Sequence, residues 1–198
     1  MSISTGNFCR TGHGYLVRLV CALALCSAAA GALAQGSAGP YVPTPWVIVD
    51  ELLKLADIKK GDYLIDLGSG DGRLVITAAK RYGSSGMGID IQAPLVQVAT
   101  QNAYAEGVSD RVRFVEGDLF LADLSRASIV TIYLLPSIMD KLVPKLLNDL
   151  KPGTRIVSHD YALGDMKYDR VLNFEFPEKV AISGTTRTVL YHYTVPSR

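Results

Sequence analysis

Cysteine is absent from most of this sequence. The three cysteines, Cys9, Cys21 and Cys26, all lie within its first 26 residues. The rest of the chain has no thiol, so neither a disulfide nor a thiolate zinc site can stabilise it. Histidine is also scarce, because only His159 and His192 follow the early segment. A histidine-based metal site is therefore not expected, and we predict a domain without a metal.

An excess of charge of either sign is lacking as well. The 198 residues include 20 lysines and arginines and 19 aspartates and glutamates. Residues 1–34 hold Arg10, Arg18 and no acid, so the remaining chain has 18 basic and 19 acidic residues. This balance provides no electrostatic footprint for nucleic acid or for an anionic membrane. We therefore expect neither of them as a partner.

Acidic residues are missing from the first quarter of the chain, where the first is Asp50. This early part contains Arg10 and Arg18, an apolar stretch beginning at Leu19, and an Ala32-Leu33-Ala34 site. A basic start, an apolar stretch shorter than the about 20 residues of a spanning helix, and a small-residue site are typical of a cleaved secretory signal. We predict cleavage after Ala34, export to the periplasm or the medium, and no stable membrane span afterwards.

Three other interpretations of this leader stay open. They are an uncleaved membrane anchor, a lipoprotein signal cut before Cys26, and a mitochondrial presequence. Leu25 argues against the lipoprotein signal because a small residue is expected there, and two arginines are few for a presequence. The favoured interpretation divides the chain into a signal peptide at 1–34, a linker at 35–40 and one domain at 41–198. Such a domain is long enough to bury a proper core.

A glycine-rich turn organises the domain. Tyr63–Leu67 has the composition of a buried strand, Gly68, Gly70 and Gly72 follow at every second position, and Leu74–Arg81 has helical spacing. A turn between a strand and a helix exposes backbone N–H groups at the carboxyl end of the strand, where ligands bind in open α/β sheets. The alternative for so short a motif is a tight turn without a ligand.

The acids around this turn favour a ligand with a cationic end. Asp66 precedes the first glycine, and Asp71 lies within the turn. Two carboxylates repel a pyrophosphate, and the spacing differs from the G-x-G-x-x-G of dinucleotide sites. S-adenosylmethionine, which has an ammonium group and a sulfonium, fits this arrangement better.

Two later strands also end in acids. Asp90 closes an apolar strand beginning at Gly86, where it can accept hydrogen bonds from ribose hydroxyls, and Ile91 can pack on the adenine. Asp118 follows a strand beginning at Val112 and is placed to meet an adenine amino group. Taken singly, each of these acids is more often a helix cap or a solvated turn residue. Together they predict one rim of carboxylates.

These motifs resemble those of class I S-adenosylmethionine-dependent methyltransferases. The residues that carry the resemblance are Asp66–Arg73, Gly88–Asp90, Gly117–Leu119 and Leu150–Gly153. Tyr41–Pro45 and Tyr133–Pro136 further resemble the mitochondrial ATP-synthase c-subunit lysine methyltransferases and their bacterial relatives. The resemblance implies a Rossmann-like α/β fold, with a seven-stranded sheet, the last strand antiparallel and helices on both faces. It also implies in-line methyl transfer to a protein lysine.

The resemblance and the strand tips together predict the site residues. The predicted cofactor residues are Tyr41, Thr44, Asp66, Gly68, Gly70, Asp71, Gly72, Asp90, Ile91, Asp118 and Leu119. In the resembling family, the segment corresponding to Tyr41–Thr44 closes over the cofactor. The predicted catalytic residues are Tyr133, His159 and Asp160. Tyr133 is the first candidate to line the acceptor channel, because a hydroxyl favours the neutral amine that attack requires.

Helix signals punctuate the rest of the domain. Thr44 is expected to cap a helix that ends near Asp57, with Trp46 in the core. Further helices are predicted at Ala93–Glu106, at Leu121–Ser125, and from a Ser137 cap to about Leu150, with Pro144 kinking or restarting the last. The remaining strands are predicted at Ala127–Leu134, at Thr154–Val157, and in a hairpin of Lys179–Ser183 and Arg187–Val195 around Gly184. The stretch Ala162–Phe176 is left unassigned.

Two other functional classes stay open. A small-molecule methyltransferase would share every cofactor feature, so the acceptor can be a protein or a small molecule. An exported non-catalytic module with the same fold is the second alternative, because S-adenosylmethionine is a charged cytosolic compound. The intact glycine turn and its three carboxylates argue against that module. The sequence does not indicate an oligomeric state.

Overall fold

The structure is a computed structural model, and it describes residues 41–180 and 184–197. The predicted signal peptide and linker lie outside these residues. None of the described helices combines the length and the apolar character that a bilayer-crossing helix needs.

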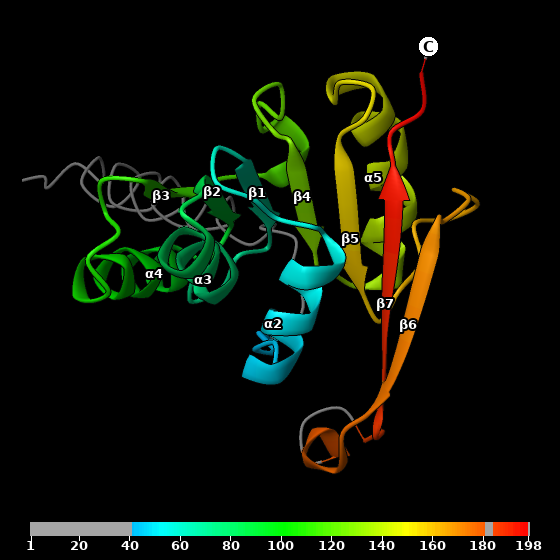
Figure 1. The fold of residues 1–198 in the computed structure, drawn as a ribbon, viewed down its shortest axis with the longest axis horizontal. Helices are drawn as coiled ribbons and strands as arrows, with labels where there is room; N and C mark the ends of the chain where they lie inside the picture. The colour runs from blue at the N-terminus through cyan, green and yellow to red at the C-terminus, as the bar shows by residue number, and fades with distance from the viewer. Residues whose placement is uncertain (1–40, 181–183, 198) are drawn as a thin grey trace, which may run out of the picture. The chain divides into compact units, whose positions relative to one another are not determined.

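Seven strands form one mixed sheet in the order β3-β2-β1-β4-β5-β7-β6 (Figure 1). The strands are β1 (Tyr63–Leu67), β2 (Ser85–Asp90), β3 (Val112–Glu116), β4 (Ile129–Ile132), β5 (Arg155–His159), β6 (Arg170–Glu175) and β7 (Arg187–Thr194). Strand β7 runs antiparallel to both of its neighbours, β5 and β6, whereas the pairs among β1 to β5 are parallel. The predicted seven-stranded sheet with its last strand antiparallel is confirmed.

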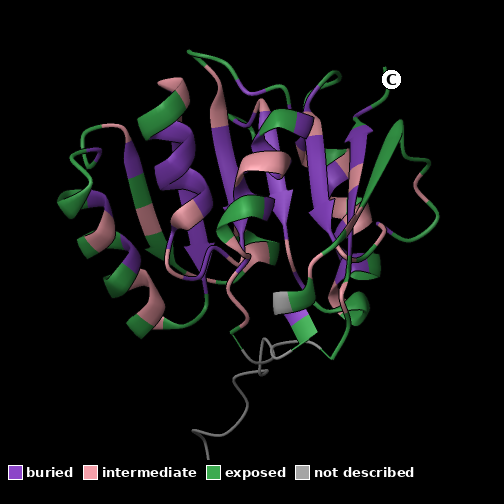
Figure 2. Cartoon of the chain, turned by 60° about the horizontal axis from the view of Figure 1, so that its bottom comes forward, coloured by how far each residue is buried: buried purple, intermediate pink, exposed green. Residues whose placement is uncertain are grey.

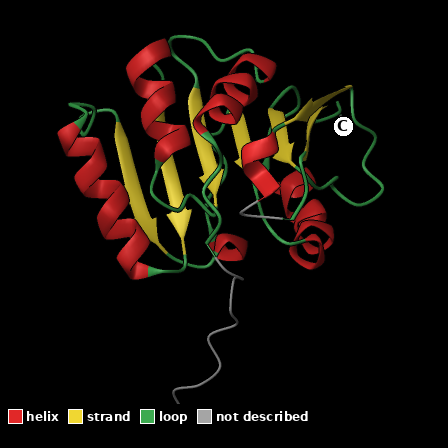
Figure 3. Cartoon of the chain, turned by 90° about the horizontal axis from the view of Figure 1, so that it is seen from below, coloured by secondary structure: helices red, strands yellow, loops and turns green. Residues whose placement is uncertain are grey.

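Helices cover both faces of the sheet, as predicted (Figure 3). They are α2 (Trp46–Leu55), α3 (Arg73–Tyr82), α4 (Ala93–Ala105) and α5 (Pro136–Asp149). The side chains of α2 and α3 pack with Leu64 of β1 in one apolar core, and those of α5 pack with Ile65 in another. Adjacent residues of one strand thus serve opposite faces, because successive side chains of a strand alternate between them.

The central strands are buried on both faces, which explains their nearly continuous apolar sequences (Figure 2). Edge strand β6 differs, because five of its six residues are exposed. Its exposure explains why no apolar pattern marked it within the unassigned stretch from Ala162 to Phe176.

The start of α2 differs from the prediction. Its N-cap is Pro45, and Thr44 does not cap the helix with its side chain. The Thr44 hydroxyl instead lies 3.4 Å from Nδ1 of His159. Trp46 was expected in the core, but it is 60% exposed. It lies two residues before the fully buried Ile48, about 200° around the helix, and therefore on the opposite face.

Two other predicted elements are wrong, and a third, the helix expected up to about Leu150, is present but differs at its start. The short helix expected at Leu121–Ser125 is a 3-10 turn, η1, at Leu119–Leu121. Helix α5 begins with Pro136 after an N-cap at Leu135, so Ser137 is not its cap, and the helix continues through Pro144 without a restart. Lys179 was expected to open a strand, but it ends a 3-10 turn, η2 (Pro177–Lys179); residues 181–183 lie outside the described part. The hairpin partner of β7 is β6.

One edge of the sheet gathers the functional segments. The parallel strands β1, β2, β4 and β5 all end there, so their tips are neighbours. Because β7 is antiparallel, it begins at this edge, and β6 ends beside it. The connection between β6 and β7, which contains η2, therefore lies at the edge where β5 ends (Figure 1).

Candidate active site

The glycine turn is fastened to the tip of β2. The backbone N–H groups of Gly68 and Ser69 both donate to the carbonyl oxygen of Ile89, at 2.9 and 3.0 Å. The Gly70 N–H donates to Oδ2 of Asp90 at 2.9 Å, and the Gln92 N–H donates to Oδ1 at the same distance. A carboxylate has about four acceptor positions, so Asp90 retains capacity for two ribose hydroxyls.

Tyr41 lies directly on this turn. Gly70 has a φ of +52°, and a Cβ atom there would lie 2.3 Å from a ring carbon of Tyr41. Only glycine therefore allows the ring to approach the backbone this closely. Burial, followed by the negative charge of Asp71, raises the pKa of the Tyr41 hydroxyl. This position fits the predicted lid role of Tyr41, which stays a prediction.

Asp71 and Arg73 form a rigid pair at the start of α3. The Arg73 guanidinium donates Nε to Oδ1 at 2.9 Å and Nη2 to Oδ2 at 2.5 Å. Although burial opposes ionisation, these bonds lower the pKa of Asp71. The third nitrogen of Arg73, Nη1, donates to the Thr44 carbonyl at 2.7 Å, and the guanidinium stacks on Trp46 at 4.8 Å. The turn is thereby tied to the segment before α2.

Asp66 lies within the sheet and faces little solvent. It is 3% exposed, and its Oδ1 accepts a hydrogen bond from the Thr131 hydroxyl of β4 at 2.6 Å. Burial raises the pKa of Asp66 to about 7, and the nearby charges of Asp90 and Asp71 add to this. Near neutral pH the carboxyl group is thus poised to ionise when a cation approaches.

The predicted adenine residues lie after β2 and β3. Asp118 is exposed and uses Oδ1 to accept from the Phe120 N–H at 2.8 Å, so it caps η1. Its second oxygen is not engaged in this cap. Leu119 is half-buried, whereas Ile91 and Phe120 are each 37% exposed. Apolar side chains beside the rim acids are the surface expected for an adenine ring.

The residues of this rim fit S-adenosylmethionine chemically. Backbone N–H groups, a carboxylate for hydroxyls, a buried carboxyl group for a cation and apolar walls match the parts of that molecule. Asp66, Gly70, Asp90 and Ile91 would hold it. When bound, it supplies an electrophilic methyl group on a sulfonium.

The three predicted catalytic residues come together at the tips of β4 and β5. The Tyr133 and His159 ring centroids lie 3.9 Å apart. The Tyr133 hydroxyl donates to Oδ2 of Asp160 at 3.2 Å. Burial, and then the charge of Asp160, raise the pKa of Tyr133, so this hydroxyl keeps its proton in the physiological range.

His159 is a neutral imidazole. It is fully buried, and burial lowers its pKa to about 4 despite the opposing charge of Asp160. Its Nε2 faces Oδ1 of Asp160 at 3.7 Å, and its Nδ1 lies 3.4 Å from the Thr44 hydroxyl. This environment favours a proton on Nε2, facing the carboxylate, with Nδ1 as the acceptor for Thr44. Thr44 thus contacts both halves of the site, through its carbonyl and its hydroxyl.

Asp160 has an uncommon backbone conformation, with a φ of +63°. Its N–H donates to the Val189 carbonyl at 2.7 Å, and its Oδ1 accepts from the Val189 N–H at 3.2 Å. Strand β7 therefore holds the carboxylate toward Tyr133. Its Oδ2 also accepts from Nζ of Lys179 at 2.6 Å. Lys179 was missed in the sequence because it was assigned to a strand, and no motif marks it.

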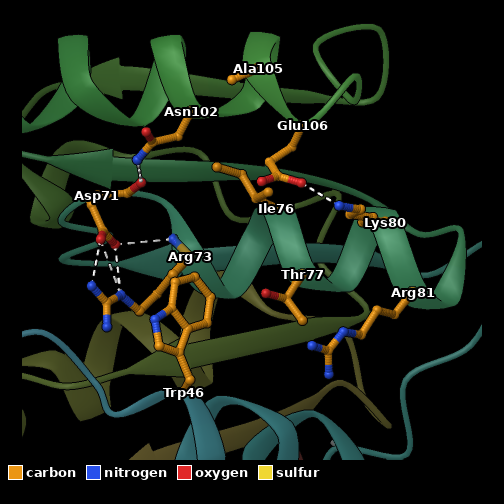
Figure 4. Close-up of a pocket in the computed structure, with 10 residues that line it drawn as sticks. All are labelled: Trp46, Asp71, Arg73, Ile76, Thr77, Lys80, Arg81, Asn102, Ala105 and Glu106. Atoms are coloured by element: carbon orange, nitrogen blue, oxygen red, sulfur yellow. Dashed lines mark hydrogen bonds and ion pairs between the residues drawn. The ribbon is translucent and has the colours of Figure 1, made fainter.

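A hollow of about 340 Å³ lies between α3 and α4, next to Asp71 of the glycine turn (Figure 4). It is lined by Trp46, Asp71, Arg73, Ile76, Thr77, Lys80, Arg81, Asn102, Ala105 and Glu106. The three cations of this lining each form an ion pair with a carboxylate, in the pairs Arg73–Asp71, Lys80–Glu106 and Arg81–Asp50. The hollow is therefore charge-balanced and does not resemble a phosphate site.

Comparison with known proteins agrees with this geometry. Residues 66–170 match the ANTKMT methyltransferase domain. The chain belongs to this family. It is also 39% identical over 137 residues to a protein-lysine N-methyltransferase of Saccharolobus islandicus, covering 69% of this chain and 85% of that protein. The chain is thus an S-adenosylmethionine-dependent methyltransferase.

Two further proteins are similar to this methyltransferase. A crystal structure described as an RNA methyltransferase from Salinibacter ruber, bound to S-adenosylhomocysteine, is 48% identical with a TM-score of 0.71 and covers 79% of this chain and 95% of that one. The ATP synthase c-subunit lysine N-methyltransferase of Xenopus laevis is 36% identical, covering 60% of this chain. The match spans about half (52%) of the length of that enzyme.

Proposed function

We propose that this methyltransferase transfers the methyl group of S-adenosylmethionine to the side-chain nitrogen of a protein lysine. The observation that carries the proposal is the tip of β4, where the Tyr133 ring packs on a neutral imidazole and its hydroxyl donates to a carboxylate that is already paired with a cation. The protein-lysine N-methyltransferases among the relatives support the same acceptor class.

Methyl transfer to a lysine has two requirements at this edge of the sheet. The acceptor nitrogen must be neutral, because an ammonium has no lone pair, and the free pKa of lysine is about 10.4. It must also be held in line with the methyl group and away from water. The Tyr133 hydroxyl donates a hydrogen bond to Asp160, so its oxygen is able to accept a hydrogen bond from an N–H of the amine. The neutral His159 adds no positive charge that would repel an approaching cation.

The test measures both cofactor and acceptor. Calorimetric titration of the purified chain with S-adenosylmethionine and S-adenosylhomocysteine should give micromolar binding, lost in Asp90→Ala and retained in the surface control Asp110→Ala, whose side chain is 76% exposed. Tritiated S-adenosylmethionine with poly-L-lysine should then yield methyl-lysine after hydrolysis. If S-adenosylmethionine binds but no methyl-lysine forms, the proposed lysine acceptor is contradicted and the cofactor assignment stands.

RNA is the competing acceptor, and it is an outcome of the same assay. The Salinibacter protein is described as an RNA methyltransferase. After position 34 this chain has 18 basic and 19 acidic residues. The cations that line the hollow beside Asp71 are each paired with a carboxylate. RNA binding generally needs an excess of unpaired cations. Label in RNA rather than in poly-L-lysine would reverse the assignment.

We also propose that the chain is exported after cleavage behind Ala34. The support is the basic, acid-free start, the short apolar stretch and the Ala32-Leu33-Ala34 site. N-terminal sequencing of the protein recovered from an expressing bacterium should begin at Gln35. A start at Met1 or Cys26 would favour the membrane-anchor or lipoprotein interpretation.

A further inference from the structure

We propose that Lys179 is a positioning residue that neutralises Asp160, so that the acceptor lysine is held at Tyr133 as a neutral amine. This inference rests on the protein-lysine specificity proposed above.

Lys179 is buried at the site although it lies far from the motifs. Its side chain is 3% exposed, and its Nζ donates to Oδ2 of Asp160 at 2.6 Å and to the Arg187 carbonyl at 2.7 Å. The topology brings it there, since the connection between β6 and β7 lies at the edge where β5 ends. A lysine is rarely buried this deeply unless it is paired.

One carboxylate oxygen serves both Lys179 and Tyr133. Oδ2 of Asp160 accepts from Nζ at 2.6 Å and from the Tyr133 hydroxyl at 3.2 Å. The other oxygen accepts from the Val189 N–H and faces Nε2 of His159. The titratable side chains that face Asp160 are thus Lys179 from η2, Tyr133 from the tip of β4 and His159 from β5. Since His159 is neutral, Lys179 supplies the positive charge among these three.

This charge pairing bears directly on the acceptor. An unpaired carboxylate next to Tyr133 would favour the ammonium form of an acceptor lysine held there and raise its pKa. With Lys179 on Asp160, that attraction is cancelled, and the acceptor can give its proton to water. The nitrogen lone pair then forms a bond to the methyl carbon as the carbon–sulfur bond breaks. The positive charge moves from sulfur to the methylated nitrogen.

The experiment compares the pH dependence of kcat for methylation of poly-L-lysine. In Lys179→Met and Lys179→Gln, the rising limb should move to higher pH by about one unit, which corresponds to about a tenfold lower kcat near pH 7. Lys179→Arg keeps the cation and should keep the wild-type limb. The double variant Asp160→Asn with Lys179→Met removes both charges and should move the limb back toward the wild type.

Two controls separate this role from a structural one. Lys145→Met removes another partly buried lysine, whose Nζ pairs with Asp149 at 2.5 Å on α5, and should not move the limb. Affinity for S-adenosylhomocysteine should be unchanged in the Lys179 variants. If the rising limb of the pH profile stays in place in both Lys179→Met and Lys179→Gln, the role of Lys179 is contradicted but the proposed acceptor is not. Absence of methyl-lysine with the wild-type protein would overturn the proposed acceptor and the inference with it.

Discussion

The Tyr133 and His159 rings lie against each other with an interplanar angle of 31°, joining the tips of the neighbouring strands β4 and β5. The same His159 is within 3.4 Å of the Thr44 hydroxyl, and the Thr44 carbonyl accepts from Arg73. One contiguous set of contacts thus links the glycine turn to the tips of β4 and β5. Arg73 lies at the turn end of this set, and Thr44 joins Arg73 to His159.

His159 should stay neutral throughout the physiological range. Because burial lowers its pKa to about 4, protonation in the folded state should occur about 2.5 pH units below that of a free histidine. Its contribution to stability is therefore present above about pH 6.5 and is lost as the pH falls toward 4. The NMR shift of its imidazole proton, assigned with His159→Gln, gives the midpoint. A midpoint above 6 would contradict the buried, neutral state.

Gly70→Ala should weaken cofactor binding through Tyr41. The added Cβ would lie 2.3 Å from the Tyr41 ring, which must then leave the turn. We expect about a tenfold higher Kd for S-adenosylhomocysteine, equivalent to about 1.4 kcal/mol. Gly107→Ala is the matched control, because Gly107 also has a positive φ, +67°, but its Cβ would meet nothing within 4 Å. Equal losses of affinity in both variants would show that backbone strain, and not Tyr41, is responsible.

Asp66 should make the cofactor-free protein less stable at alkaline pH. Its pKa of about 7 lies above the unfolded value of about 3.9, so the folded state holds the proton more tightly. The stability that this provides is full below about pH 4 and is lost as the pH rises through 7. The stability of Asp66→Asn relative to the wild type should therefore rise by about 1–3 kcal/mol between pH 5 and pH 8. Urea unfolding at both values measures this, and a gain of equal size at both would be evidence against a raised pKa.

Trp46→Ala should cost little stability. The indole is 60% exposed, and its stacking on Arg73 contributes about 0.5–1 kcal/mol. Ile48→Ala, on the buried face of the same helix, should cost about 2–5 kcal/mol. Urea unfolding of the two variants compares them directly. A similar loss of stability in both variants would indicate that Trp46 is buried in the core.

The local pattern was enough to predict that the glycine turn and Asp90 lie together. The strand, glycine turn and helix at 63–82 are contiguous in sequence, so their spacing specifies their geometry. Asp90 follows at the tip of the adjacent parallel strand, and the regular order of βα units places it beside Gly70. The helical period could also have corrected Trp46, whose position relative to Ile48 puts it on the exposed face. The helix was predicted correctly, but Trp46 was assigned to its buried face instead of its exposed face.

The sequence by itself determined the five parallel strands, because each is marked by a short-range hydrophobic pattern. It also determined the fold class and the family, through a resemblance carried by motifs in several βα units. The tertiary structure decided where Thr44 and Lys179 lie relative to His159 and Asp160. Thr44 reaches His159 across 115 positions, and Lys179 reaches Asp160 across 19. The Lys179 contact depends on the antiparallel insertion of β7 beside β5, which brings the β6–β7 connection to the edge where β5 ends. The local conformational preferences of these residues do not predict where the β6–β7 connection lies.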